Sequence, residues 1–205
     1  MTKYQFNKKE FGTHKLILSY LNKNELVLDV GCGSGYLAAN SPGNQFYGIE
    51  INKNSAKNAE KFYKKTYLSD IEKFDGRLLS RKKFDILIFA DILEHLSFPE
   101  KTLTYFVDKF LKDNGRVIIS LPNIAHLTIR LNLLIGKFDY TESGILDKTH
   151  RCFYTLKSAK NLIKKSGLVI EKIDYSSNRL GFWLKKFPIL GTLLGFNLIF
   201  YCRKK

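Results

Sequence analysis

The sequence predicts an α/β fold, with an open, mostly parallel, doubly wound sheet and an antiparallel last strand. Short, almost continuously apolar runs, typical of strands buried on both faces, recur at residues 26–30, 45–50, 66–70, 84–91 and 116–121. Helical patterns separate these runs, and such alternation implies parallel strands joined by right-handed crossovers. The last two strands, 168–175 and 197–203, are joined by a Pro- and Gly-rich insert with no obvious helix, which favours an antiparallel pairing at the sheet edge.

Local start and stop signals bound the expected helices. Asn52 is placed to cap one helix, Pro99 to open another, and Gly167 to end a third. The helices are expected at residues 8–21, 36–40, 53–65, 71–80, 99–111, 124–135 and 155–166. Residues 92–96 are expected to form a turn or short helix, and 136–153 a long loop rich in His, Asp, Arg and Tyr.

The length of 205 residues predicts one domain, residues 1–205, with a substantial core. Within it we expect an N-terminal helix at 8–21, a core at 25–175, the insert at 178–196 and the last strand at 197–203.

The charge is strongly basic, with a formal net charge of +15. Such a charge is typical of proteins that bind nucleic acid or anionic lipid. However, the lysines are scattered along the whole chain and only seven arginines are present, although arginine is the preferred residue for bidentate phosphate recognition. A lysine-rich composition is therefore favoured over nucleic-acid binding.

Three widely separated cysteines form neither a metal-spaced pair nor a disulfide framework, so we predict a reducing, cytoplasmic location and no metal site. The N-terminus lacks the apolar core of a signal peptide. The apolar segment 187–202 is too short to span a bilayer, and it overlaps the segment 180–200, for which two interpretations are open. An insert packed on the domain is favoured there, and peripheral contact with an anionic membrane is the alternative.

A glycine-rich turn follows the first strand, at Gly31, Gly33 and Gly35. Glycine lets backbone N–H groups approach a ligand closely. Four acids, Asp29, Glu50, Asp70 and Asp91, fall at the carboxyl ends of strands, where ligands of open α/β sheets bind. Glu50 lies 19 positions after Gly31 (50 − 31), close to the ~20 expected for a carboxylate that binds ribose hydroxyls.

The glycine spacing discriminates between two nucleotide cofactors. A dinucleotide site carries the pattern G-x-G-x-x-G, whereas here the third glycine comes one residue earlier. Asp29, just before the turn, is a poor neighbour for a pyrophosphate but suits a ligand with an ammonium group and a sulfonium. These residues favour S-adenosylmethionine.

Residues 27–35, VLDVGCGSG, resemble motif I of the class I S-adenosylmethionine-dependent methyltransferases. Residues 48–50, 90–96 and 115–123 are similar to later motifs of that family, and the resemblance covers about residues 10–175. Within the family, the chain is most similar to small bacterial and archaeal enzymes of the ubiquinone-biosynthesis-like branch, some linked to surface-glycan pathways.

The resemblance implies a Rossmann-like seven-stranded sheet whose last strand is antiparallel. It also implies that the three glycines line the methionine part of the cofactor, that Glu50 binds both ribose hydroxyls, and that Asp70 and Ile71 flank the adenine. The cofactor-binding residues expected on these grounds are Asp29, Gly31, Cys32, Gly33, Gly35, Glu50, Ile51, Asp70, Ile71, Ala90 and Asp91.

Methyl transfer to a hydroxyl benefits from a general base, and histidine titrates near neutral pH. The catalytic candidates are His150, Asp147 and His126, and His150 is favoured because a long polar loop beside a site often carries substrate contacts. Substrate-binding candidates are Asn123, Arg130, Tyr140 and Arg151. His95 is expected to order the turn after the fourth strand, and Glu94 to cap the backbone that follows.

The leading hypothesis is an O-methyltransferase acting on a small molecule or a glycan. The alternatives are an RNA or other nucleic-acid methyltransferase, which only the charge favours, and a non-catalytic cofactor-binding scaffold. The sequence leaves the acceptor and the oligomeric state open.

Overall fold

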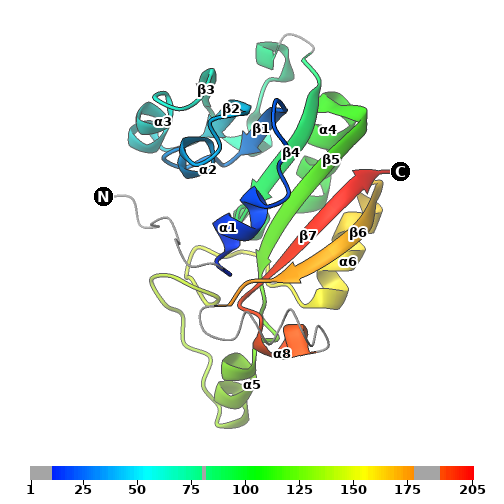
Figure 1. Cartoon of the computed structure of the whole chain (residues 1–205). Helices are drawn as coiled ribbons and strands as arrows, with labels where there is room; N and C mark the ends of the chain where they lie inside the picture. Colours follow the sequence, from blue (N-terminus) through cyan, green and yellow to red (C-terminus); the bar gives the residue numbers. More distant parts are fainter. Residues whose placement is uncertain (1–10, 80–81, 178–189) are drawn as a thin grey trace.

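A seven-stranded sheet forms the centre of the protein in the computed structural model, which describes residues 11–79, 82–177 and 190–205 (Figure 1). The strand order is β3-β2-β1-β4-β5-β7-β6. The strands are β1 (Leu26–Val30), β2 (Gln45–Glu50), β3 (Lys65–Leu68), β4 (Phe84–Ala90), β5 (Leu111–Pro122), β6 (Leu168–Tyr175) and β7 (Asn197–Lys204).

The pairing confirms the predicted mostly parallel sheet with an antiparallel last strand. Strands β1 to β5 pair in parallel, whereas β7 is antiparallel to both β5 and β6. The expected antiparallel pairing of the last two strands at the sheet edge is also confirmed: β7 is inserted between β5 and β6, and β6 is the edge strand. Both neighbours of β7 then satisfy its backbone hydrogen bonds, which suits its buried apolar residues 198–200.

Helices flank the sheet and connect its strands (Figure 1). The α-helices are α1 (Thr13–Leu18), α2 (Tyr36–Ala39), α3 (Lys53–Ala59), α4 (Pro99–Phe110), α5 (Leu127–Leu134), α6 (Leu156–Lys165) and α8 (Gly191–Leu194). Three short 3-10 turns are η1 (Ile71–Lys73), η2 (Gly76–Leu79) and η3 (Leu93–His95).

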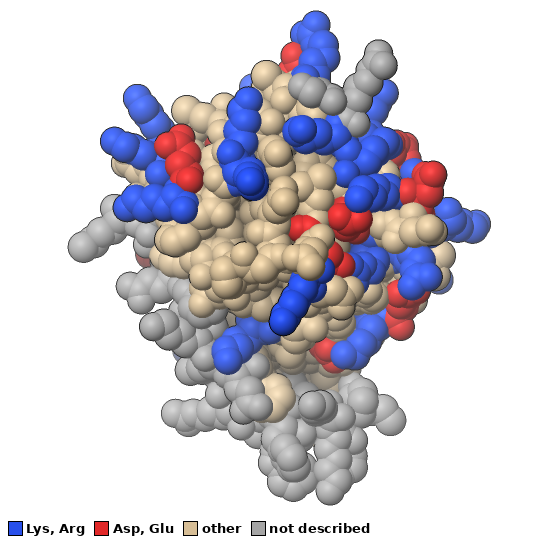
Figure 2. Space-filling model, turned by 45° about the horizontal axis from the view of Figure 1, so that its top comes forward, with Lys and Arg blue, Asp and Glu red and all other residues tan. Residues whose placement is uncertain are grey.

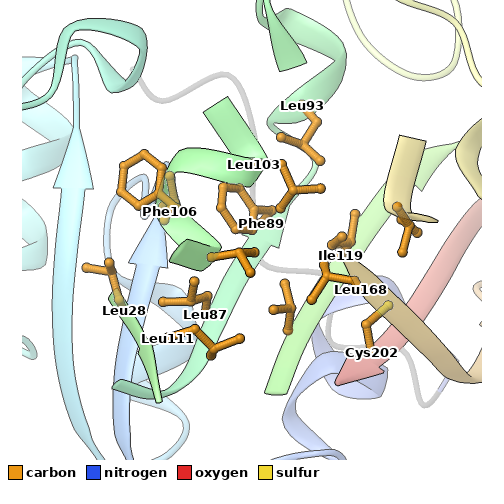
Figure 3. Packing of buried hydrophobic residues seen from close by; sticks show 14 of the residues in the cluster. Leu28, Leu87, Phe89, Leu93, Leu103, Phe106, Leu111, Ile119, Leu168 and Cys202 are labelled. Atoms are coloured by element: carbon orange, nitrogen blue, oxygen red, sulfur yellow. The ribbon is translucent and has the colours of Figure 1, made fainter. Parts of the chain in front are cut away.

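Two hydrophobic clusters lie on opposite faces of the sheet. Along β1, Leu28 and Val30 belong to the larger cluster, whereas Val27 belongs to the other, as the alternation of side chains in a strand requires. Helices α4 and α6 cover the larger cluster, and α1, α2 and α3 contribute to the second. In the larger cluster Phe106 of α4 packs beside Phe89 of β4 (Figure 3).

Two predicted helices are shorter than expected, because residues at their ends contact strands of the sheet instead of continuing the helix. The segment expected as helix 53–65 stops at Ala59, and the backbone N–H of Lys64 instead donates to the carbonyl oxygen of Phe46 in β2. The helix expected at 8–21 covers only Thr13–Leu18 within the described residues, and Tyr20 beyond it stacks on Tyr201 of β7.

Three further boundaries differ from the sequence prediction. The expected helix 71–80 consists of η1 and η2, because Asp70 caps only a single turn. Helix α5 starts at Leu127 rather than residue 124, where the side chain of His126 caps it. Strand β5 begins at Leu111 rather than at residue 116, and its pairing with β4 shifts register between Phe84 and Ile86.

Most of the insert expected at 178–196 lies outside the described residues, as does much of the segment 180–200 considered for membrane contact. Only α8 and the residues next to it are described there. Among the described residues, no helix is both long and apolar enough to cross a membrane.

The aromatic packing under α4 gives a stability prediction. Phe106 is fully buried and contacts Phe74, Phe89 and Phe110. Phe106→Ala is expected to lower the free energy of unfolding by about 3–5 kcal/mol, because it removes this contact area and leaves a cavity. Urea-induced unfolding followed by circular dichroism measures the change.

Phe98→Ala is the matched control, because Phe98 precedes the same helix but is 65% exposed. Equal losses in the two variants would contradict the packing described for Phe106.

Candidate functional site

A cavity of about 1390 Å³ opens at the carboxyl ends of the parallel strands. The ends of β1, β2 and β4 form its floor, and the loops 91–95 and 144–150 close one side. Residues of the N-terminal segment and the start of β7 complete the wall. This is the position at which open α/β sheets bind their ligands.

The three glycines of the turn after β1 serve different purposes. Gly31, Gly33 and Gly35 all have positive φ angles, of 84°, 53° and 86°. A Cβ on Gly31 would lie 2.7 Å from Cγ1 of Ile92, and one on Gly35 would lie 3.0 Å from Cα of Ala59 in α3. Gly33 has no atom within 4 Å of a Cβ position among the described residues, and it lines the cavity. Gly33 is therefore the glycine that leaves room for a ligand, whereas Gly35 lets α3 pack closely.

The side chain of Glu50 joins the end of β2 to the turn after β1. One carboxylate oxygen, Oε2, accepts from the backbone N–H of Gly33 at 2.9 Å, and the other accepts from the N–H of Asn52 at 2.8 Å. Because Glu50 also lines the cavity, these two hydrogen bonds fix its carboxylate at the cavity wall.

Asp29 of β1 is fully buried on the cavity floor. Its Oδ2 accepts from the hydroxyl of Tyr63 at 2.6 Å, whereas Oδ1 has no hydrogen-bond partner in the part of the chain that the structure describes. Burial raises the pKa of Asp29 to about 7, despite the hydrogen bond from Tyr63, which lowers it. An orphaned carboxylate oxygen at this position fits a cationic ligand group.

Asp91 follows β4 with a φ of 50°, a backbone conformation unusual for a residue other than glycine. Its Oδ1 accepts from the hydroxyl of Ser120 and from the side-chain amide of Asn197, both at 2.6 Å. Strands β5 and β7 thus hold Asp91 against the cavity, and the role of Asn197 has no signal in the sequence.

The other predicted cofactor residues divide into two groups. Cys32, Ile51 and Ala90 line the cavity. Burial raises the pKa of the Cys32 thiol, in keeping with a packing role. Asp70 and Ile71, expected beside the adenine, do not line it: Asp70 caps η1 through the N–H of Glu72, and Ile71 is buried in the core.

Of the three catalytic candidates, only His150 lines the cavity. Asp147 is fully buried in the 136–153 loop, where its Oδ1 accepts from the backbone and hydroxyl of Thr149. His126 instead caps α5 through Thr128. Asp147 and His126 therefore position backbone in this structure.

None of the four substrate-binding candidates lines the cavity in the described residues. The buried side chain of Asn123 donates to the carbonyl oxygens of Thr192 and Gly195, so it anchors the chain before β7. Arg130 donates to the carbonyl oxygen of Ala125, ahead of α5, and Arg151 donates to the hydroxyl of Ser97. Tyr140 is 58% exposed.

Sequence reasoning missed several side chains that line the cavity beside His150. They are His14, Glu94, His95, Thr149, Ser176 and Asn197. His95 does tie the η3 turn to the 136–153 loop, through contacts of Nδ1 with Thr149, as expected for an ordering residue. The Glu94 side chain does not cap the backbone, because its oxygens lack hydrogen-bond partners in the described part of the chain.

The strand order, the glycine turn after β1 and the acid closing β2 are those of a class I S-adenosylmethionine-dependent methyltransferase. The chain belongs to the family described as "Methyltransferase domain", whose model matches residues 4–173. The predicted family and cofactor, S-adenosylmethionine, are thus confirmed. The comparison with curated proteins gave no match.

Solved structures share this fold at low sequence identity. Magnesium protoporphyrin IX methyltransferase from Synechocystis PCC 6803, solved with bound SAH, is 18% identical with a TM-score of 0.67, covering 94% of this chain and 82% of that one. A SAM-dependent methyltransferase from Archaeoglobus fulgidus is 20% identical with a TM-score of 0.65, covering 93% and 94%. The small RNA methyltransferase HEN1 is 18% identical with a TM-score of 0.69, covering 94% of this chain but 25% of its own.

The raised pKa of Asp29 predicts a pH-dependent stability. The folded chain holds a proton on Asp29 up to about pH 7, whereas the unfolded chain releases it from about pH 4, so this group costs stability as the pH rises between those values. Relative to Asp29→Asn, the wild type is expected to lose about 2–3 kcal/mol of unfolding free energy between pH 5 and pH 8, since one pKa unit corresponds to about 1.4 kcal/mol. Urea unfolding at the two pH values measures the difference.

Asp108→Asn, at an exposed carboxylate of α4, controls for the general effect of removing a negative charge. If the unfolding free energies of the wild type and of Asp29→Asn changed in parallel between the two pH values, Asp29 would be charged in the folded chain and the prediction would be wrong.

Proposed function

We propose that this methyltransferase transfers the methyl group of S-adenosylmethionine to a hydroxyl oxygen of a small-molecule or glycan acceptor. The observation that carries the proposal is that one cavity contains both the glycine turn and the imidazole of His150. A hydroxyl must lose its proton on methylation, and an imidazole lone pair is suited to engage that proton.

The residues at the strand ends fit the cofactor. Glu50 has both oxygens oriented by backbone N–H groups and is suited to accept hydrogen bonds from the ribose hydroxyls. The orphaned Oδ1 of Asp29 and the open space over Gly33 suit the ammonium and backbone of the methionine part. When bound, the cofactor supplies an electrophilic methyl group on a sulfonium.

His150 is the side chain best suited to the acceptor. Its Nδ1 lies 3.0 Å from the carbonyl oxygen of Ile145, and because a carbonyl only accepts, the neutral ring carries its proton on Nδ1. The lone pair is then on Nε2, where it can bind the acceptor hydroxyl and orient it. Such alignment accounts for much of the catalysis expected of an in-line displacement.

The alternative acceptor is RNA, which the net charge of +15 and the fold shared with HEN1 favour. Figure 2 shows Lys and Arg side chains spread round the visible face, with Asp and Glu among them, rather than gathered into one basic patch. That distribution supports a lysine-rich composition over an RNA surface, and we keep the small-molecule or glycan acceptor. A cytoplasmic location, with or without peripheral membrane contact, suits such an acceptor.

Gly33→Arg is expected to abolish cofactor binding, because the new side chain would occupy the open space over the turn and distort a φ of 53°. Isothermal titration with S-adenosylhomocysteine measures the affinity, and we expect a loss of at least about 100-fold, since a blocked site forfeits more than ~2.7 kcal/mol.

Gly167→Arg is the control for backbone strain, because Gly167 also has a positive φ and open surroundings but lies after α6. If Gly33→Arg binds as tightly as Gly167→Arg, the assigned cofactor site is wrong.

His150→Ala is expected to keep the affinity for S-adenosylhomocysteine within a few fold and to lower turnover by about 10²–10⁴-fold, the usual contribution of a residue that handles the acceptor proton. Transfer of labelled methyl groups to fractionated cell extracts measures turnover. His126→Ala separates the two histidine candidates and is expected to retain turnover, since His126 lies outside the cavity wall. Undiminished turnover in His150→Ala would exclude the role given to His150.

A further inference from the structure

Three side chains that commonly bind metals converge on one wall of the cavity. Glu94 and His95 come from η3, and His150 comes from the 136–153 loop. One ligand atom from each lies within 4.8 Å of the other two. The rings of His95 and His150 lie edge to face, with centroids 4.8 Å apart.

Of these three groups, the Glu94 carboxylate is the one whose burial its neighbours explain least. Glu94 is 1% exposed, and neither of its carboxylate oxygens has a hydrogen-bond partner among the residues that the structure describes. A buried carboxylate without a donor or a cation costs free energy. Its backbone carbonyl, in contrast, accepts from the N–H groups of Arg151 and Cys152, which fixes η3 against the loop.

Both imidazoles are oriented by oxygen atoms at Nδ1. His150 Nδ1 lies 3.0 Å from the carbonyl oxygen of Ile145, and His95 Nδ1 lies 3.3 Å from that of Thr149. The neutral rings therefore carry their protons on Nδ1 and their lone pairs on Nε2. Metal-bound histidines show this arrangement, in which the second ring nitrogen donates to a carbonyl or carboxylate.

Burial and the neighbouring His150 lower the pKa of His95. Burial and the negative charge of Asp91 raise the pKa of Glu94. A cation between the three groups would compensate for both the burial and the like charge.

Ligand atoms of the three side chains thus lie close together, and no hydrogen bond joins the three side chains in the described part of the chain. We propose that Glu94, His95 and His150 form a binding site for one divalent transition-metal cation at the acceptor end of the cavity. Two imidazoles and one carboxylate suit Zn²⁺, Mn²⁺ or Fe²⁺ better than Ca²⁺ or Mg²⁺.

The spacing is compatible with such an ion after small side-chain rotations. Ligand atoms about 2.1 Å from a tetrahedral ion lie roughly 3.4 Å apart. The three groups, now within 4.8 Å of one another, would therefore approach by up to about 1.4 Å. Three protein ligands leave at least one coordination position open toward the cavity.

The role of the cation rests on the proposed function. A cation in this position would bind the acceptor hydroxyl directly and lower its pKa, so that the hydroxyl would release its proton to water in the open cavity. His150 would then hold the metal and position the acceptor through it, instead of taking up the proton itself. The acceptor class would then be one whose oxygen atoms can ligate a metal ion, such as a diol or a hydroxy acid.

The test is metal binding to the full chain after treatment with EDTA, with Mn²⁺ as the probe and Zn²⁺ as its competitor. Electron paramagnetic resonance of free Mn²⁺ gives stoichiometry and affinity without acceptor or cofactor. We expect one saturable site that Zn²⁺ displaces, and at least about 10-fold weaker binding in His95→Ala and in Glu94→Gln. His126→Ala, a histidine outside the cavity wall, is the matched control and is expected to bind like the wild type.

Thermal unfolding gives a second readout, independent of the resonance signal. Mn²⁺ is expected to raise the Tm of the wild type but not that of His95→Ala. No saturable binding and no rise in Tm, or equal affinity in Glu94→Gln and His126→Ala, would overturn the site. Because the assay contains no acceptor, a failure to bind metal would not contradict the proposed hydroxyl acceptor. Conversely, metal binding without methylation of hydroxyl acceptors would overturn only the proposed acceptor.

Discussion

The close approach of the turn after β1 to the end of β2 is the constraint on which the site depends. The N–H groups of Gly31 and Cys32 both donate to the carbonyl oxygen of Ile49, and the N–H of Gly33 donates to the Glu50 carboxylate. Gly48 makes room for this approach, because a Cβ there would lie 2.5 Å from Sγ of Cys32. The floor of the cavity is therefore built by backbone geometry more than by side-chain chemistry.

The rest of the fold supports this junction from two sides. Tyr63, beyond the end of α3, donates to Asp29 beneath the turn, and Ile92 after β4 packs against Gly31 above it. Strand β7 contributes Asn197, whose side-chain amide donates to Asp91 after the end of β4. Its insertion between β5 and β6 thus brings the end of the chain into contact with the cavity.

The side of the cavity formed by η3 and the 136–153 loop is built differently, because it depends on one loop packed against one turn. The backbone carbonyl of Glu94 receives the N–H groups of Arg151 and Cys152, while His95 contacts Thr149. Asp147 fixes the loop internally through Thr149. Residues 54–58 positions apart in sequence are thereby brought together at one wall of the cavity.

By itself the sequence determined the strands, their mostly parallel order and the cofactor, because apolar runs, glycine spacing and strand-end acids are local signals. It also singled out His150 in the long loop. Only the tertiary structure decided the ends of α1 and α3 and the insertion of β7, because long-range hydrogen bonds and packing set them. It likewise separated His150, which lines the cavity, from Asp147, His126 and Asn123, which hold backbone in place. The grouping of Glu94, His95 and His150 has no signal in local spacing, since it exists only where the loop folds back on the turn after β4.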